Sequence, residues 1–328
     1  MKTRVVITVD TEPSIAGAYE DPGRNLPLIH EPVWGEVDGR SEALGFLIRT
    51  LRQHSLAATF FTETAHVRYF GADLMGAYAR SLKEAGQDVQ LHIHPTWTNF
   101  ENGELKHRHA YGDDCHLMET GDLARLIAEG CDLIEGWTGD RPTSMRTGNF
   151  STAMNVFEAM SAAGLKTSSN LCIAANRPEE IPLQIAGGVK RYAGILEYPV
   201  TCFSDSGPVG RGRRRPLQVT SISAAEQIST LENVHAMGGS VAVILTHPFE
   251  FLKREQVRFT RMRPNRLVQR RFERLCAYLA ANSDRFDVVP MSKIGDELTT
   301  EEALPDIAGS TLNSLMRSAE NFLNDKIF

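Results

Sequence analysis

Hydrophobic and polar residues follow two different periods along this chain, one typical of β-strands and one typical of α-helices. A continuous apolar run at residues 5–9 predicts a buried strand. Between residues 41 and 53, Leu44, Leu47 and Leu51 share one face at helical spacing. The predicted strands are residues 5–9, 56–62, 89–94, 143–146, 165–168, 241–246 and 286–289, and the predicted helices are residues 41–53, 74–85, 122–137, 151–163, 224–237 and 267–281.

Strand and helix alternate about seven times, which indicates a parallel sheet whose strands are joined by helical crossovers. Helices must then cover both faces of an open sheet or the outside of a barrel. A closed or partly open β/α barrel agrees best with this pattern. Chemistry in such folds gathers at the carboxyl ends of the strands. The polar residues at predicted strand ends are Asp10, His92, His94, Arg146 and His247.

The 328 residues are interpreted as one catalytic domain with a short addition. We assign residues 1–298 to the domain and residues 299–328 to a C-terminal amphipathic extension, which we expect to dock on the barrel or on a partner subunit of a homo-oligomer. Three long loops interrupt the pattern, at residues 12–39, 97–118 and 204–216. The first two directly follow strand ends, so they are either walls of a substrate cleft or ordinary surface insertions.

Composition excludes several classes of protein. The net charge of -6 is spread along the chain, which argues against nucleic acid as a partner. No apolar stretch is long enough for a transmembrane segment, and the chain opens with a strand and not a signal peptide, so we expect a cytoplasmic protein. The five cysteines are odd in number and widely spaced, which predicts reduced, structural thiols.

A pair of histidines predicts a metal site. His92 and His94 are two residues apart in a strand, so both side chains point to the same face. A His-x-His pair alone also occurs on surfaces and in cores, but the position at a strand end, before Pro95, favours ligation. Two imidazoles, a carboxylate and open water positions are typical of a catalytic divalent site, usually zinc. Asp10 and Glu12 supply the nearest carboxylates.

Short motifs at the strand ends occur in a distinctive order. They are Thr8-Val9-Asp10-Thr11-Glu12, Ala58-Thr59-Phe60-Phe61, Leu91-His92-Ile93-His94-Pro95, Met145-Arg146-Thr147-Gly148-Asn149, Leu245-Thr246-His247-Pro248 and Phe286-Asp287-Val288-Val289-Pro290. Over roughly residues 4–295 this order resembles the polysaccharide deacetylase family, also called NodB-homology or carbohydrate esterase 4-like. The resemblance implies a distorted (β/α)7-type barrel, one divalent metal ion held by an acid and two histidines, a carboxylate base and a histidine acid.

Carried over by this resemblance, His92 and His94 become metal ligands. Many family members have two adjacent aspartates on the first strand, whereas here Asp10 and Glu12 are separated by one residue. We favour Asp10 as the base and Glu12 as the ligand, because the longer glutamate can reach back toward the ion. The division between these two carboxylates stays open. The histidines are also two apart where members commonly space them four apart, a spacing that still permits chelation.

The resemblance also assigns residues to proton transfer. His247 ends an apolar strand and would protonate the leaving amine, while Arg146 would hold the base ionised and oriented. A backbone N–H near Gly148 and Asn149 would stabilise the oxyanion. Family members often tune the acid histidine with an aspartate on the next strand, but residues 165–170 contain no acid. Either another group tunes His247 or it operates without one.

An arginine-rich run, Arg211-Gly212-Arg213-Arg214-Arg215, has two interpretations. It is a solvated loop, or it binds the diphosphate of a nucleotide- or lipid-linked sugar.

The predicted function is that of a metal-dependent hydrolase, with Zn2+ as the expected ion, that removes an N-acetyl or other acyl group from an amino sugar. The substrate would be an acetylated amino sugar in a polysaccharide or in its lipid- or nucleotide-linked precursor. Two alternatives remain. The chain could instead be an amidohydrolase of a small non-sugar amide or ureide, or a non-catalytic glycan-binding protein.

Overall fold

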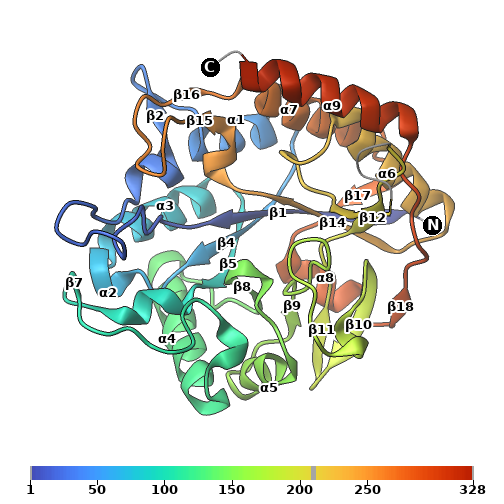
Figure 1. Cartoon of the computed structure of the whole chain (residues 1–328). Helices are drawn as coiled ribbons and strands as arrows, with labels where there is room; N and C mark the ends of the chain where they lie inside the picture. Colours follow the sequence, from blue (N-terminus) through green and yellow to red (C-terminus); the bar gives the residue numbers. More distant parts are fainter. Residues whose placement is uncertain (1, 208–211, 327–328) are drawn as a thin grey trace.

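A curled, mostly parallel sheet forms the centre of the molecule (Figure 1). The computed structural model describes residues 2–207 and 212–326. Within them the sheet has the order β14-β1-β4-β5-β8-β9-β11-β10-β18, and β17 pairs with the start of β1. Its strands are β1 (Thr3–Thr11), β4 (Thr59–Glu63), β5 (Asp88–Ile93), β8 (Ser144–Thr147), β9 (Thr167–Ser168), β10 (Gly188–Tyr192), β11 (Ile195–Glu197), β14 (Val241–Thr246), β17 (Phe286–Val288) and β18 (Glu302–Ala303).

Helices cover the outside of this sheet, as the alternating pattern predicts (Figure 1). Six of them lie where helices are predicted, and their apolar stripes face the core, as with Leu44, Leu47 and Leu51. Helix α6 also begins with a capping box between Ser223 and Glu226. The helices are α1 (Leu44–Gln53), α2 (Val67–Phe70), α3 (Asp73–Glu84), α4 (Thr120–Thr138), α5 (Met154–Ala162), α6 (Ala224–Ala236), α7 (Arg266–Ala281), α8 (Met291–Glu297) and α9 (Thr311–Lys326).

Irregular backbone, and not a strand ladder, lies between β14 and β11. The amide of Leu245 donates to the carbonyl oxygen of Leu217 (2.9 Å), and the amide of Val219 donates to that of Leu245 (3.1 Å). The amide of Leu217 donates in turn to Thr201 (2.7 Å). The barrel is therefore partly open, within the range that the sequence predicts, and we call this stretch the seam.

Short antiparallel hairpins lie in or at the edge of each of the three predicted long loops, and one more follows β14 outside them. These are too short to show strand periodicity, which is why the sequence pattern does not reveal them. The described hairpin strands are β2 (Glu36–Val37) with β3 (Arg40–Ser41), β6 (Phe100–Glu101) with β7 (Glu104–Leu105), β12 (Cys202–Ser204) with β13 (Arg214–Pro216), and β15 (Leu252–Lys253) with β16 (Arg263–Pro264).

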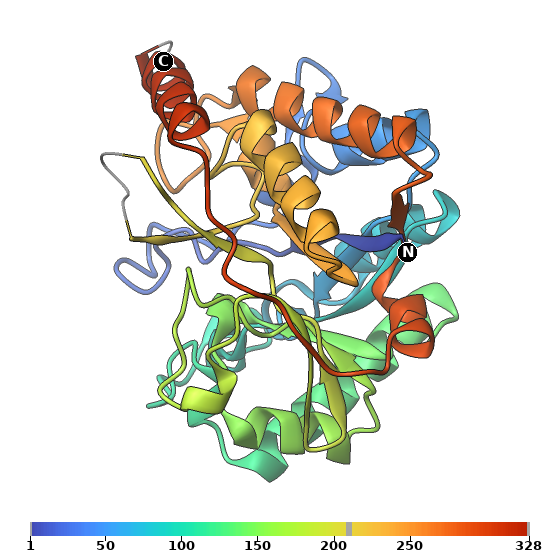
Figure 2. The same ribbon diagram turned by 90° about the vertical axis from the view of Figure 1, so that its right-hand side faces the viewer.

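The C-terminal extension crosses the molecule to reach α9 (Figure 2). Its first part adds β18 to the sheet edge, and the amide of Ser204 donates to the carbonyl oxygen of Ile307 (2.8 Å). Helix α9 then docks on the barrel through a polar face, because buried Arg317 pairs with Asp205 (2.7 Å) and Glu226 (2.5 Å). Docking on the barrel is as expected, but the apolar face points outward. The domain boundary at residue 298 stays a prediction.

Two predictions from composition can be compared with the fold. All five cysteines are buried and free in this structure, and their reduced state stays a prediction. In the described part of the chain, no helix is long and apolar enough to cross a membrane.

Candidate metal centre and active site

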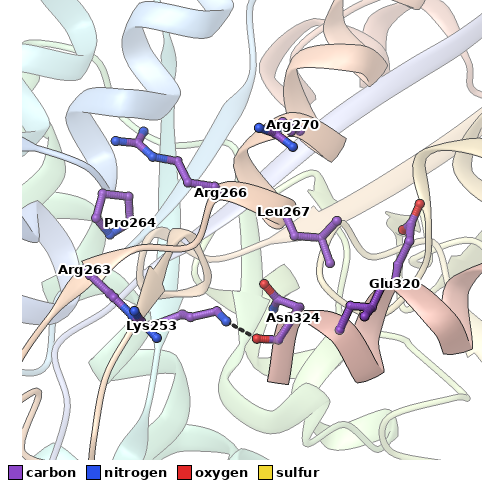
Figure 3. A pocket seen from close by; sticks show the side chains of 9 residues that line it. Lys253, Arg263, Pro264, Arg266, Leu267, Arg270, Glu320 and Asn324 are labelled. Atoms are coloured by element: carbon purple, nitrogen blue, oxygen red, sulfur yellow. Dashed lines mark hydrogen bonds between the residues drawn. The ribbon is translucent and has the colours of Figure 1, made fainter. Parts of the chain in front are cut away.

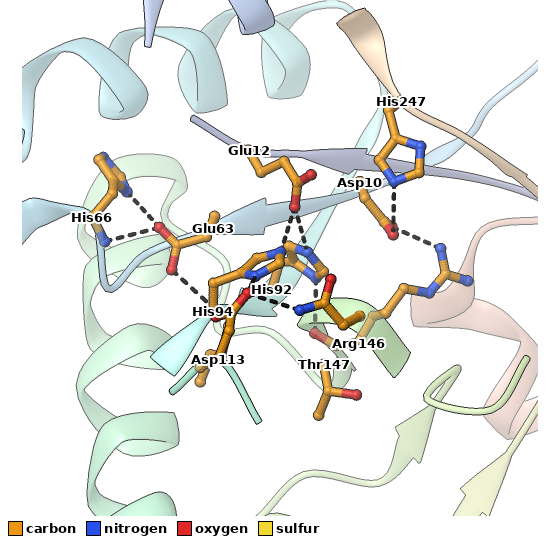
Figure 4. A network of polar contacts seen from close by, with 12 residues as sticks. Asp10, Glu12, Glu63, His66, His92, His94, Asp113, Arg146, Thr147 and His247 are labelled. Atoms are coloured by element: carbon orange, nitrogen blue, oxygen red, sulfur yellow. Dashed lines mark hydrogen bonds and ion pairs between the residues drawn. The ribbon is translucent and has the colours of Figure 1, made fainter. Parts of the chain in front are cut away.

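Six predicted site residues meet at the carboxyl end of the sheet (Figure 4). Strands β14, β1, β4, β5 and β8 are successive neighbours, so side chains at their ends share one edge. His92 lies on β5 and His94 directly after it. The other four are Asp10 on β1, Glu12 directly after β1, Arg146 on β8 and His247 directly after β14.

Three of these side chains converge on one point. One carboxylate oxygen of Glu12 lies 3.1 Å from Nε2 of His92 and 2.5 Å from Nε2 of His94. Within the described residues, Glu12, His92 and His94 form a group that could hold a metal ion. Their ligand atoms all lie within 4.8 Å of one another. Two imidazole nitrogens and a carboxylate are a donor set that divalent zinc accepts. The residues therefore fit the implied metal.

The far nitrogens of both imidazoles are also fixed. Nδ1 of His92 donates to the carbonyl oxygen of Arg146 (2.8 Å), and Nδ1 of His94 donates to the carboxylate of Asp113 (2.7 Å). Such partners set the tautomer and leave each Nε2 toward the metal position. Burial opposes a charge on His94, but Asp113 and Glu12 raise its pKa well above the usual range. The same two carboxylates would attract a metal cation.

Gly148 is required by the close approach of the His94 ring. A Cβ atom added at Gly148 would lie 2.3 Å from Nδ1 of His94, closer than any real contact. The amide side chain of the next residue, Asn149, donates to Asp113 (2.8 Å). The Gly148-Asn149 turn thus packs against the metal centre, and an oxyanion role for its backbone stays a prediction.

Arg146 holds the carboxylate of Asp10 from a fully buried position. Its Nη1 donates to Asp10 (2.7 Å) and to the hydroxyl of Thr8 (2.9 Å). The other side of the guanidinium donates to the carbonyl oxygen (2.8 Å) and the hydroxyl (2.7 Å) of Ser169. A ring face of Phe61 lies 4.6 Å from the guanidinium carbon. Ser169 therefore helps to orient Arg146, and it lies in residues 165–170, where family members often have an aspartate.

Glu250 is an acidic residue in contact with His247. It lies in the 3₁₀ turn Pro248–Phe251, and its carboxylate is 3.0 Å from Nδ1 of His247. Thr246 (2.8 Å) and Gln218 (2.5 Å) donate to the same carboxylate. Burial alone would lower the pKa of His247, but Glu250, with smaller contributions from Asp10 and Glu12, raises it to about 9. His247 is therefore held in its protonated form.

Asp10 lies between the arginine and the histidine. One of its carboxylate oxygens contacts Arg146, and the other lies 3.7 Å from Nε2 of His247. A carboxylate and an imidazole thus lie side by side next to Glu12, His92 and His94, and they are the candidates for a base and an acid.

Glu250 and Asp113 were not identified by sequence reasoning. The available signal for Glu250 was its spacing of three residues from His247, which a 3₁₀ turn brings onto one side. Asp113 lies in a long loop, 19 residues after His94, so no periodic pattern marks it.

A cavity of about 220 Å³ adjoins the metal centre. Its lining includes Glu12, His94 and Asp113. Ile15 and Pro32 come from the first predicted long loop and Trp97 from the second, so both loops contribute walls to this cavity.

The described part of the arginine-rich run, residues 212–215, lies outside this cavity. Arg214 pairs with Asp306, and Arg215 with Asp205 (2.5 Å), and neither lines the cavity. These pairs favour the structural interpretation of the run over a diphosphate clamp. Arg211 lies outside the described residues.

Comparisons with known proteins agree with this geometry at the level of the fold. No model of a known family and no curated protein matches the sequence. Among solved structures, a Mycobacterium smegmatis protein provisionally assigned as a polysaccharide deacetylase has a TM-score of 0.55 at 18% identity, covering 93% of this chain and 94% of its own.

Two more distant neighbours carry the family name. A family 4 carbohydrate esterase from Streptomyces lividans, in complex with acetate, has a TM-score of 0.43 at 16% identity, with 93% and 98% of the two chains covered. A family 4 pseudoenzyme from Bacillus anthracis has a TM-score of 0.46 at 11% identity, with 90% and 66% covered. On the first of these three similarities, this chain has the fold of the polysaccharide deacetylases, as its motifs predict.

Proposed function

We propose that this protein is a metal-dependent hydrolase that cleaves the amide C–N bond of an N-acylated amino sugar, most simply an N-acetyl group, in a glycan or its lipid- or nucleotide-linked precursor. The observation that carries this proposal is the contact of Asp10 with both Arg146 and His247, beside the convergence of Glu12, His92 and His94. A metal-dependent amide hydrolase combines these three elements: a base, an acid and a polarising cation.

We assign Glu12, His92 and His94 to one divalent cation, with zinc as the expected ion. When bound, such an ion would polarise the acyl carbonyl and acidify the attacking water. Asp113 and the carbonyl of Arg146 orient the two imidazoles for this role. Hydrogen bonds of this kind raise the affinity of a site for its metal and fix the orientation of its ligands.

In the proposed reaction Asp10 accepts a proton from the attacking water, whose oxygen forms a bond to the acyl carbon. Arg146 orients Asp10 for this role, because its guanidinium donates a hydrogen bond of 2.7 Å to the carboxylate. His247 then donates a proton to the nitrogen as the C–N bond breaks. The products are a carboxylic acid and a free amine. Exchange with solvent restores both groups.

Five buried thiols without a disulfide support a reducing compartment, such as the cytoplasm, as the place of action.

The test is hydrolysis by the full chain, stripped of metal and reloaded with zinc. Acetate and amine should be released in equal amounts from N-acetylated amino sugars, and chelation should abolish this release. Ureides serve as the second substrate panel. Hydrolysis of ureides alone would replace the sugar assignment, whereas metal-independent sugar binding without turnover would favour a glycan-binding protein.

A further inference from the structure

Arg254 places a positive charge on the wall of the cavity beside the metal centre. Its guanidinium carbon lies 4.1 Å from the ring centroid of Phe259 and 5.3 Å from that of Phe249. Phe249 in turn stacks on His247, with ring centroids 4.9 Å apart. The turn that carries the candidate acid therefore also positions this cation.

No acidic side chain neutralises Arg254. Within residues 2–207 and 212–326 it forms neither a hydrogen bond nor an ion pair. Burial lowers its pKa, and no neighbouring charge contributes. Other arginines of this segment are occupied: Arg258 donates to the carbonyl of Leu26 (2.7 Å), and Arg261 pairs with Glu255 (3.2 Å). A stacked guanidinium of this kind presents its fork of donors to an oxyanion.

We propose that Arg254 binds a carboxylate or phosphate group of the substrate, so that the preferred substrate is an acidic amino sugar. This inference rests on the proposed function. The polarity of the cavity supports it, because Glu12 and Asp113 line the same cavity as Arg254. A substrate with its neutral amide toward the metal ligands and its anion toward Arg254 places the negative charge beside the cation and not beside the two carboxylates.

Matched sugars test this proposal on the zinc-loaded protein. N-acetylglucosamine is compared with N-acetylmuramic acid, which adds a carboxylate, and with N-acetylglucosamine 1-phosphate. We expect Arg254→Gln to raise the KM of whichever acidic sugar the wild type prefers by roughly 10- to 100-fold, the loss typical of a charged hydrogen bond, and to leave the neutral sugar unchanged. Arg261→Gln, on the same segment but outside the cavity lining, is the control.

Binding to the non-hydrolysing Asp10→Asn variant, measured as a rise in melting temperature, separates the two hypotheses. If Arg254 binds the anion, Arg254→Gln in this variant removes the extra rise in melting temperature that the acidic sugars give. If this loss is seen but the wild type hydrolyses no sugar, the anion site stands and only the proposed function fails. Equal binding of acidic and neutral sugars by the parent, or equal weakening of both by Arg254→Gln, would overturn the anion site.

Helix α9 carries a second inference that does not depend on the reaction. Its large apolar side chains, which we call the stripe, are spaced three, four or seven residues apart on one face and are between 49% and 66% exposed. The opposite, docked face contains buried Ser314 and Arg317. The stripe consists of Leu312, Leu315, Met316, Phe322 and Leu323.

Several basic side chains line a cavity beside α9 (Figure 3). A cavity of about 520 Å³ is lined by Leu323 of the stripe and by four basic residues. The acidic residue in its lining, Glu320, pairs with Arg271 (2.9 Å). The four basic residues, which we call the basic cluster, are Lys253, Arg263, Arg266 and Arg270.

We infer that the stripe and the basic cluster together bind an anionic lipid surface. An interfacial helix buries apolar side chains among the headgroups, and adjacent cations add attraction to anionic lipids. The charge of the basic cluster is complementary to such a surface and contrasts with the net charge of -6 of the chain. A lipid-bound position would bring the protein to lipid-linked sugars.

Sedimentation with vesicles tests this surface on the full chain. The wild type should bind vesicles of phosphatidylcholine with phosphatidylglycerol and bind pure phosphatidylcholine much less. Leu315→Ser with Phe322→Ser, and separately Arg266→Gln with Arg270→Gln, should each reduce binding at least tenfold. Ile181→Ser removes an exposed apolar side chain elsewhere and is the control.

Two outcomes would overturn the lipid surface. One is wild-type binding that is absent or unaffected by both double variants. The other is a stable dimer in sedimentation velocity that Leu315→Ser with Phe322→Ser dissociates, since a second copy would then cover the stripe.

Discussion

The carboxylate of Glu250 lies 3.0 Å from Nδ1 of His247, three residues earlier in the chain. This pair places the charge that controls the candidate acid on the same turn as the acid itself. In the metal-free chain the pKa of His247 is about 9, above its ordinary value, so the protonated form persists through neutral pH. A bound divalent cation would lower this value by repulsion.

Glu250→Gln should therefore shift the pH profile. The amide can still accept from Nδ1 but carries no charge, so the pKa of His247 falls and the alkaline limb of kcat/KM moves to lower pH. The stability that protonated His247 adds in the metal-free protein, present below its unfolded pKa and lost as pH rises toward 9, should also decrease. Glu255→Gln is the control, because Glu255 is exposed, and it should change neither the alkaline limb nor this stability. An unchanged alkaline limb would contradict this prediction.

His92→Ala and His94→Ala should each abolish retention of metal without unfolding the chain. His92 is buried, but both side chains lie at the end of β5 and outside the apolar clusters, so their loss leaves the apolar packing in place. Metal content per protein and the circular dichroism spectrum measure the two effects. Stoichiometric metal in the double variant would refute this ligand assignment.

Asp10→Asn and His247→Ala should both retain metal yet lose activity on an amide by roughly 10² to 10⁴, the usual cost of removing a general acid or base. An acetyl ester separates their roles, because an alkoxide needs less protonation than an amine. His247→Ala should recover relative activity on the ester, whereas Asp10→Asn should not. If Asp10→Asn strips the metal and Glu12→Gln does not, the two carboxylates exchange roles.

Gly148→Ala should weaken metal binding by displacing the His94 ring. The new Cβ would overlap Nδ1 at 2.3 Å and disturb the bond to Asp113. Loss of such a supporting contact typically costs 10- to 100-fold in metal affinity. Gly136→Ala is the matched control, because nothing lies within 4 Å of its added Cβ on α4. Equal metal affinity in both variants would show that the ring relaxes freely.

Sequence reasoning located what depends on periodicity. Strands β1, β5, β8 and β14 end beside the polar residues predicted there. A buried parallel strand appears in the sequence as an apolar run, and the first polar residue after the run marks the end of the strand. His92 and His94 were found in this way. The parallel order of these strands then brings distant parts of the chain to one edge.

The rest depends on contacts that have no period. Asp113 reaches His94 through an irregular loop, and β11 is too short to be recognised as a strand. The amphipathic pattern of α9 was recognised, but its orientation was not. That orientation follows from Arg317, whose pairing with Asp205 and Glu226 is visible only in three dimensions.

The seam of the barrel also has a kinetic consequence. Between β14 and β11 a few hydrogen bonds of Leu217, Val219 and Leu245 replace a continuous strand ladder, whereas β1 is paired along both edges. Regions held by few backbone hydrogen bonds open at lower free energy than paired core strands. Amide hydrogens of Leu217 and Val219 should therefore exchange with deuterium well before those of Val6 and Ile7. Local opening of the barrel should begin on the side of His247.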